Sequence, residues 1–85
     1  MKAIFSMLKN PRSYPAKGTG ELRTAHNIEV KVPGEGTGDL FVSEEVYRKA
    51  ASLGLKDGEE VELQFGARVF RGGVTPVVVG LVRSA

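Results

Sequence analysis

Cationic and aromatic side chains gather near the start of the chain, in LKNPRSYPAKGTGELR at residues 8–23. Cationic side chains neutralise phosphates and release counterions, and an aromatic ring offers a flat surface to an unstacked base. This combination is typical of binding to single-stranded nucleic acid. The candidate stacking residue is Tyr14, and the candidate phosphate contacts are Lys9, Arg12, Lys17 and Arg23.

A second segment, ARVFRGG at residues 67–73, contains the same residue types beside a glycine turn. Arg68 and Arg71 are candidate phosphate contacts, and Phe70 between them is a candidate stacking residue. Other interpretations stay open at both segments. Surface loops are commonly polar and rich in glycine and lysine, Tyr14 could cover the fold locally, and Phe70 could belong to the core.

Residues that could carry out catalysis are scarce. The chain has no cysteine and a single histidine, His26, so it offers neither a thiol nucleophile nor a set of histidine and cysteine metal ligands. Its adjacent acidic residues point apart on a strand or helix and cannot form a close acid and base pair. We therefore predict that the protein is not an enzyme and uses no cofactor, metal ion or small-molecule substrate.

The length and charge pattern predict one domain with a basic surface. The chain has 85 residues, of which 41% are hydrophobic and 26% charged, as in ordinary globular proteins. Residues 1–34 hold six lysines or arginines and two acids, residues 35–62 hold three and eight, and residues 63–85 hold three and none. The two ends therefore form one cationic face if the fold brings them together.

The apolar runs of the chain are short. None approaches the ~20 residues that a membrane span needs, and the first residues lack the apolar stretch of a signal peptide. We therefore expect a cytoplasmic protein with no membrane contact.

Alternating apolar residues predict five strands. The first covers residues 2–9 and presents either Ala3, Phe5 and Met7 or Ile4 and Leu8 to the core. The second covers residues 23–32, and a short third strand covers residues 39–42. In the fourth strand the alternating apolar residues are Val61, Leu63 and Phe65. The fourth and fifth strands form a C-terminal hairpin at about residues 66–74, which turns around Gly72 and Gly73.

One helix is predicted at about residues 43–53, with Ser43 as its N-cap and Gly54 just after its last turn. Val46, Ala50 and Leu53 form a narrow apolar stripe along it. Five strands with a helix between the third and the fourth are the element order of the OB-fold. The sequence therefore predicts a mainly β single domain, residues 1–85, built as a small five-stranded OB-like barrel with one short helix.

A long basic β-hairpin arm is predicted at about residues 9–23. Hairpin loops need only about two to five residues, whereas the connection between the first two strands runs from about Asn10 to Leu22. Proline fixes φ and stiffens the arm at residues 11 and 15, and Gly18 and Gly20 permit a tight turn at its tip.

The arm and the closing segment GEEVELQFGARVFRGGVTPVVVGLVRSA, residues 58–85, resemble the single-stranded DNA-binding (helix-destabilising) proteins of filamentous phages. The resemblance covers most of the chain in pattern and little of it in identity. It implies an OB-like homodimer without enzymatic activity that coats single-stranded DNA, with RNA as an alternative, independently of sequence in phage or plasmid DNA replication.

The resemblance also implies roles for several residues. In that family a basic wing near the N-terminus carries arginines and a tyrosine, and a glycine-tipped hairpin near the dimer axis bears a phenylalanine that stacks on DNA. Phe70 corresponds to that phenylalanine, and the residues that match the wing in kind are Arg12, Tyr14, Lys17 and Arg23. The tyrosine of the family follows the glycine turn, whereas Tyr14 precedes Gly18.

Two other functions compete with this one. DLFVSEEVYRKAASLGLKDGEEVEL, residues 39–63, resembles the AbrB-like swapped-hairpin regulators, whose dimers bind duplex DNA with basic loops. Its helix begins with Glu44 and Glu45, where that family carries a proline and a basic residue. A barrel that binds another protein through an edge strand or its acidic middle segment is the third interpretation. Loss of affinity on changing Arg12 and Tyr14 would favour the single-strand interpretation.

Overall fold

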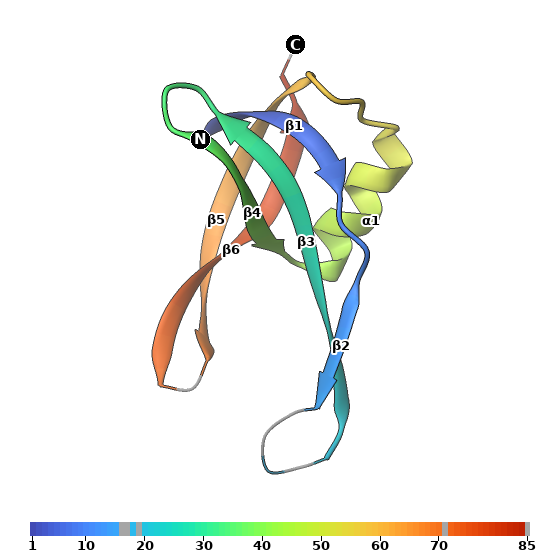
Figure 1. The fold of residues 1–85 in the computed structure, drawn as a ribbon, viewed down its shortest axis with the longest axis vertical. Helices are drawn as coiled ribbons and strands as arrows, with labels where there is room; N and C mark the ends of the chain where they lie inside the picture. The colour runs from blue at the N-terminus through green and yellow to red at the C-terminus, as the bar shows by residue number, and fades with distance from the viewer. Residues whose placement is uncertain (16–17, 19, 71, 85) are drawn as a thin grey trace.

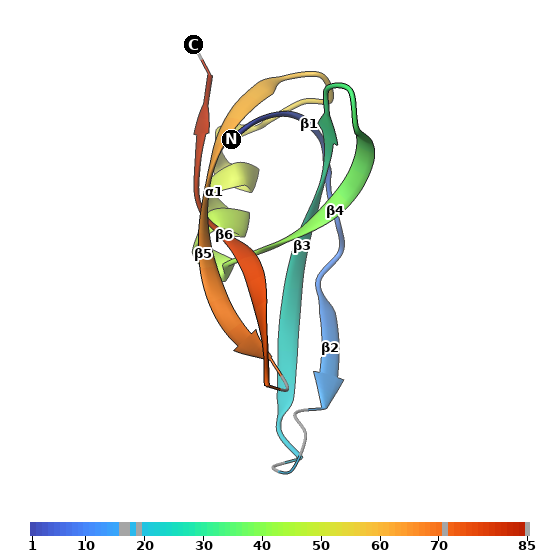
Figure 2. The same cartoon turned by 90° about the vertical axis from the view of Figure 1, so that its left-hand side faces the viewer.

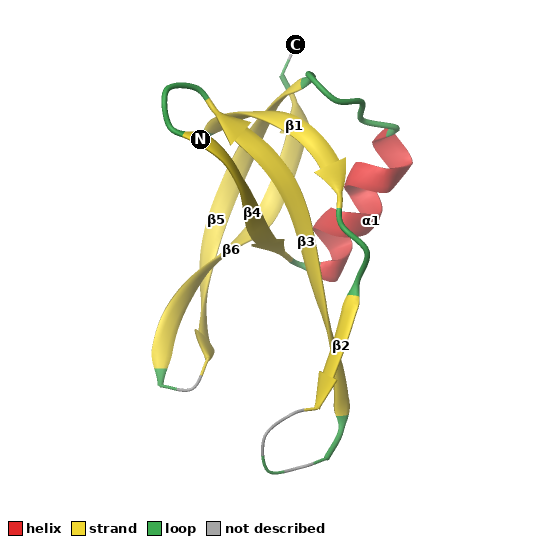
Figure 3. Ribbon diagram, in the orientation of Figure 1, coloured by secondary structure: helices red, strands yellow, loops and turns green. Residues whose placement is uncertain are grey.

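The structure is a computed structural model that describes residues 1–15, 18, 20–70 and 72–84, without the side chain of Phe70. Its elements follow in the order β1 (Lys2–Leu8), β2 (Arg12–Pro15), β3 (Leu22–Val32), β4 (Gly36–Val42), α1 (Glu44–Leu53), β5 (Glu60–Phe70) and β6 (Gly73–Arg83). Strands make up 63% of the chain (Figure 3). The predicted mainly β fold with one short helix is confirmed.

Five of the strands close into a barrel (Figure 1). β1 pairs antiparallel with β3 and β5, and the pairs β3–β4 and β5–β6 are also antiparallel. The ring closes where β4 meets β6 in parallel, at Val42 and Val78. β2 pairs with β3 outside the ring. The predicted five-stranded barrel with a hairpin arm is therefore confirmed, and the strands that overlap residues 39–63, β4 and β5, belong to a ring that closes within one chain.

The core lies inside this ring. It consists of side chains from every barrel strand and two from the helix, and its largest fully buried members are Ile28, Leu63, Leu81, Val30, Val61 and Val78. On β3 the buried residues alternate with polar ones, so one face of the strand packs inward and the other faces the surroundings. The outer face of β3 is thereby available for a binding site.

The helix begins and ends where the sequence predicts. The Ser43 hydroxyl accepts a hydrogen bond of 3.2 Å from the Val46 amide, and Gly54 adopts φ of 62°, a left-handed conformation that glycine tolerates without strain. Val46 and Ala50 face the core, and the helix packs against β6, β3 and β1. It covers one side of the barrel and leaves the outer face of β3 and β4 uncovered (Figure 1).

Two strands depart from the alternation predicted from the sequence. β1 changes register between Phe5 and Met7, so Ala3 and Phe5 are buried while Met7 is exposed, because the irregular pairing inverts the face of the residues that follow. In the β5–β6 pair the extra residue, Val79, lies on β6. Phe65 stands opposite the buried Val78 and is nevertheless 41% exposed, unlike Leu63 before it.

The third barrel strand is longer than predicted. It begins at Gly36 and not at Asp39, because its pairing with β3 continues through Lys31–Thr37 to Val32–Gly36. The sequence pattern suggested an earlier break because residues 33–38 are rich in glycine.

Two hairpins extend beyond the barrel in the same direction. β2 and the first residues of β3 form the arm, and the other hairpin consists of the end of β5 and the start of β6, joined through a turn at Gly72. Both point away from the C-terminus in two perpendicular views (Figures 1 and 2). They give the protein its elongated shape of 43 × 24 × 19 Å and bring its two basic ends to one side.

Candidate nucleic-acid interface

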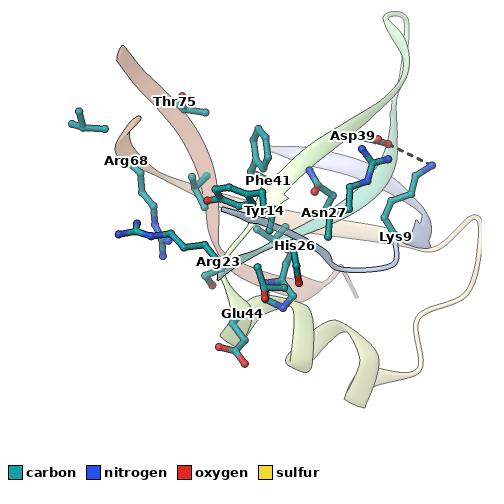
Figure 4. A pocket seen from close by; sticks show the side chains of 18 residues that line it. Lys9, Tyr14, Arg23, His26, Asn27, Asp39, Phe41, Glu44, Arg68 and Thr75 are labelled. Carbon is teal, nitrogen blue, oxygen red and sulfur yellow. Dashed lines mark ion pairs between the residues drawn. The ribbon is translucent and has the colours of Figure 1, made fainter. Parts of the chain in front are cut away.

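A groove of about 1150 Å³ lies between the arm and the β5–β6 hairpin (Figure 4). Residues of β3 and β4 form its floor, and Val42, which pairs with Val78 of β6, is among the residues that line it. Five predicted site residues line it, namely Lys9, Arg12, Tyr14, Arg23 and Arg68. Lys17, Arg71 and the side chain of Phe70, which were also predicted, lie outside the described residues.

The arm presents a ring and two guanidinium groups to the groove. Arg12 and Tyr14 are two residues apart on β2 and therefore point to the same side of the hairpin. Tyr14 stands directly opposite Arg23 of β3, and residues that are opposite in an antiparallel pair share a face. The Tyr14 side chain lines the groove and is not folded back into the core, where the alternative interpretation would have it.

Arg68 supplies the opposite wall. It stands opposite Thr75 in the β5–β6 hairpin, and both residues line the groove. In the view of Figure 4, Arg68 and Arg23 extend toward one another from the two hairpins. The N-terminal and C-terminal basic segments, which are 45 residues apart at these two arginines, thus meet at one site.

The three arginines of the groove carry charge that no acidic side chain of the described residues neutralises. Within the described ranges, no carboxylate lies within 4.0 Å of the guanidinium of Arg12, Arg23 or Arg68. A guanidinium presents several donors in a fixed fork and binds phosphate well. The groove is therefore suited to an anion with repeated phosphate groups.

The floor of the groove contains two residues that the sequence analysis did not select. Phe41 of β4 stands opposite Asn27 of β3, and both line the groove. The Phe41 side chain is 46% exposed although it is a large apolar residue in a strand. Leu40 and Val42 both pack against the core, so Phe41 between them faces outward, which the three successive apolar residues of the sequence do not indicate.

No protein-family model, curated protein or solved structure matches this chain. Its function is therefore inferred from the chemistry of the groove and from the fold. In the parts of the chain with described positions, no three histidine or acidic residues lie together where they could hold a metal ion. No helix among them is long and apolar enough to span a membrane.

Lys9, at the root of the arm, is placed differently from the arginines. Its ammonium group lies 3.4 Å from a Glu29 carboxylate oxygen and 3.9 Å from one of Asp39. These two acids stand opposite each other on the outer face of β3 and β4. Lys9 therefore balances part of their negative charge at the end of the groove, so the charge that it can offer to a phosphate is smaller than that of an unpaired arginine.

Glu29 is held in its ionised form. The Ser6 hydroxyl donates a hydrogen bond of 2.7 Å to its carboxylate, and together with Lys9 it lowers the pKa of Glu29 from the ordinary value of 4.5, against an opposing effect of partial burial. A lowered pKa means that the contribution to stability is complete above pH 4.5 and disappears as the pH falls through the lower, folded-state value.

We expect the Glu29→Gln variant to show a weaker pH dependence below pH 4.5. Its free energy of unfolding, measured in urea at pH 3 to 7, should fall less on acidification than that of the unchanged protein, because glutamine cannot take up a proton. Glu35→Gln, at an exposed turn, is the control and should follow the unchanged protein. Parallel curves for all three proteins would contradict this role of Glu29.

The root of the arm is attached to the helix through Tyr47. The Tyr47 hydroxyl donates a hydrogen bond of 2.7 Å to the Lys9 carbonyl, and the Lys9 amide donates one of 3.1 Å to the Asn27 carbonyl. The Tyr47 ring also contacts His26, with 5.1 Å between the ring centroids. These contacts fix the point at which the arm leaves the barrel and explain the single histidine as a packed side chain at the edge of the groove.

Tyr47→Phe should lower the free energy of unfolding by about 1 kcal/mol, because the Lys9 carbonyl loses a partly buried hydrogen bond. Urea unfolding followed by circular dichroism measures this change. Tyr14→Phe is the matched control, since the Tyr14 hydroxyl has no hydrogen-bond partner among the described residues and should be removed at no cost. Equal stability of both variants would show that the Tyr47 bond does not anchor the arm.

Proposed function

We propose that the protein binds single-stranded DNA in this groove independently of base sequence. Arg12 and Arg23 on one wall and Arg68 on the other would contact consecutive phosphates, and the Tyr14 ring would stack on a base. The observation that carries the proposal is the arrangement of these side chains. Three arginines without ion-pair partners among the described residues and an exposed ring line one groove.

The ring favours a single strand over a duplex. In a duplex the faces of the bases are stacked on one another, so a tyrosine in the binding surface gains nothing from them, whereas single-stranded bases offer a free face. Among the described residues no helix lies along the groove as a recognition helix, because α1 reaches it only with its first residue, Glu44, and packs against β6, β3 and β1. A tyrosine ring between cationic side chains therefore favours the binding of unpaired nucleotides over that of a duplex.

The fold supports the same function by analogy. OB-folds that bind oligonucleotides use the face of their second and third strands together with the loops between strands one and two and between strands four and five. The corresponding parts here are the outer face of β3 and β4, the arm and the β5–β6 hairpin, and these are the parts that line the groove. This similarity of fold supports the proposal, but the side chains of the groove carry it.

The biological role proposed is that of the filamentous phage proteins which the sequence resembles. The protein would coat single-stranded DNA in the cytoplasm during phage or plasmid replication, prevent the duplex from forming, and act as a homodimer without catalytic activity. Lys17, Phe70 and Arg71 would join the interface. Sedimentation equilibrium of the protein alone tests the dimer, because a mass close to the 9.1 kDa of one chain would contradict it.

Fluorescence anisotropy with a labelled oligo-thymidine tests the binding function. We expect the single strand to bind, an unlabelled duplex of equal length to compete poorly, and affinity to fall with salt at a log–log slope of about −0.7 for each phosphate contact. Equal or better competition by the duplex would overturn the preference for single strands. Affinity that does not change with salt would overturn the phosphate contacts.

A further inference from the structure

The floor of the groove places an aromatic ring beside a side-chain amide. Phe41 and Asn27 stand directly opposite each other on β4 and β3, so their side chains share the outer face of the barrel. Both line the groove between the arginines of the arm and Arg68. Figure 4 shows them near Tyr14. Neither residue is needed for the phosphate contacts of the proposed function.

The two side chains offer complementary chemistry. The Phe41 ring is nearly half exposed on the floor of the groove, which allows a planar group to lie on it. The Asn27 amide has donors and an acceptor, and among the residues whose side chains the structure describes it has no hydrogen-bond partner. The amide atoms of the partly buried Asn27 remain open to water, so they are available to form hydrogen bonds with a ligand in the groove.

A nucleobase matches this pair. It has a flat face that stacks on an aromatic ring and an edge on which donors and acceptors lie side by side. We propose that Phe41 and Asn27 form a nucleobase subsite, in which the ring stacks on one base and the amide forms hydrogen bonds with the Watson–Crick edge of that base. This inference rests on the proposed function, because it requires a single strand in the groove.

The position of the subsite also limits the path of the strand. The next cross-strand pair on the same face beyond Asn27 and Phe41 is Glu29 with Asp39. Among the described residues, Lys9 is the only cationic partner of these two negative charges. Phosphates are repelled by uncompensated carboxylates. The backbone of the strand is therefore expected to turn away at this point, and the base in the subsite is the last one on the floor of the groove.

The subsite does not require a particular base. A side-chain amide presents a donor and an acceptor, and each of the four bases carries both kinds of group on its edges. The contact therefore recognises that a base is present and unpaired, and it is compatible with binding that is independent of sequence. It also excludes duplex DNA from the subsite, because base pairing occupies the Watson–Crick edge.

An abasic strand separates contacts with bases from contacts with phosphates. The full-length protein is titrated with oligo-thymidine and with an oligonucleotide of equal length in which every base is absent. We expect the unchanged protein to bind the thymidine strand more than tenfold more tightly. Phe41→Leu should weaken binding of oligo-thymidine about tenfold and leave binding of the abasic strand unchanged. Phe65→Leu, an exposed phenylalanine that is not among the groove residues, is the matched control and should change neither.

Methylation of thymine at N3 tests the amide contact, because it blocks the edge donor and keeps the ring available for stacking. We expect the unchanged protein to bind the methylated strand about fivefold more weakly than oligo-thymidine. Asn27→Ala should bind the two strands equally, whereas the control Asn10→Ala, in an exposed position, should discriminate like the unchanged protein.

The outcomes distinguish the subsite from the function on which it depends. If the unchanged protein binds neither strand, the proposed function fails and the subsite with it. If it binds the thymidine and abasic strands equally, phosphate binding stands and the nucleobase subsite is overturned. If Phe41→Leu weakens both strands by the same factor, Phe41 maintains the shape of the groove and does not contact a base, which also overturns the subsite.

Discussion

Single-stranded DNA should bind at least about tenfold more weakly when Arg12 and Arg23 are both replaced by glutamine. Each arginine lines the groove and has no ion-pair partner among the described residues, so each can neutralise a phosphate and release a counterion. Loss of two phosphate contacts should reduce the steepness of the log–log salt dependence by about 1.4, which is twice the value of about 0.7 for one contact. Anisotropy titrations at several salt concentrations measure both quantities.

Lys31→Gln is a matched control for this variant. Lys31 lies on β3, the same strand as Arg23, but near its other end, where it pairs with β1 and does not belong to the groove. Its replacement removes one positive charge from the protein and should reduce affinity only through the weak long-range effect of net charge. A similar loss of affinity per charge at both places would mean that the groove does not localise the phosphate contacts.

Leu63→Ala should lower the free energy of unfolding by about 2–5 kcal/mol. The Leu63 side chain is 1% exposed and belongs to the core cluster on β5, so its removal leaves a cavity in a close-packed barrel. Domains of this size are marginally stable, with total values of about 5–15 kcal/mol, so this variant would lose a large part of its stability. Urea unfolding monitored by circular dichroism measures the change.

Leu22→Ala makes the same chemical change in a side chain that is 75% exposed near the tip of the arm, opposite Pro15. The difference between the two variants therefore isolates the effect of burial. We expect Leu22→Ala to change the free energy of unfolding by less than about 0.5 kcal/mol. Similar losses in the two variants would be incompatible with the barrel core described above.

Much of the fold could be predicted because its signals are local. Ser43 and Gly54 delimit the helix through contacts with their own neighbours in the chain, and the alternation of Ile28 and Val30 identifies the inner face of a strand without knowledge of its partners. The arm could be predicted from the length of the connection between two strands. Each of these features depends on only a few consecutive residues.

The features that could not be predicted depend on residues that are distant in the sequence. The exposure of Met7 follows from a register shift against a partner strand, which no pattern within one strand reveals. Lys9 follows β1 and forms ion pairs with Glu29 of β3 and Asp39 of β4. Because these partners are distant in the sequence, composition could not show that the charge of Lys9 is less available to a ligand than that of Arg12. Phe41 was not selected because three apolar residues in succession leave the inner face of a strand undetermined.

The candidate site was predicted in part for the same reason. The residue types of the arm and of ARVFRGG indicated nucleic-acid chemistry, and the fold brings Arg12, Tyr14 and Arg68 together around one groove. The polar and aromatic floor between the two hairpins belongs to β3 and β4, where no cluster of basic residues marks it in the sequence. Its contribution depends on the shape of the barrel.

A titration of the isotope-labelled protein with oligo-thymidine, followed through backbone amide resonances, tests most directly whether this groove binds a single strand. We expect the largest chemical shift changes at residues of the arm, the outer face of β3 and β4, and the β5–β6 hairpin, for example at Thr24, Phe41 and Thr75. Amides of α1 and of the turn at residues 33–35 should change little. Changes concentrated at Ala51 or Glu35, with the groove unaffected, would contradict the proposed interface.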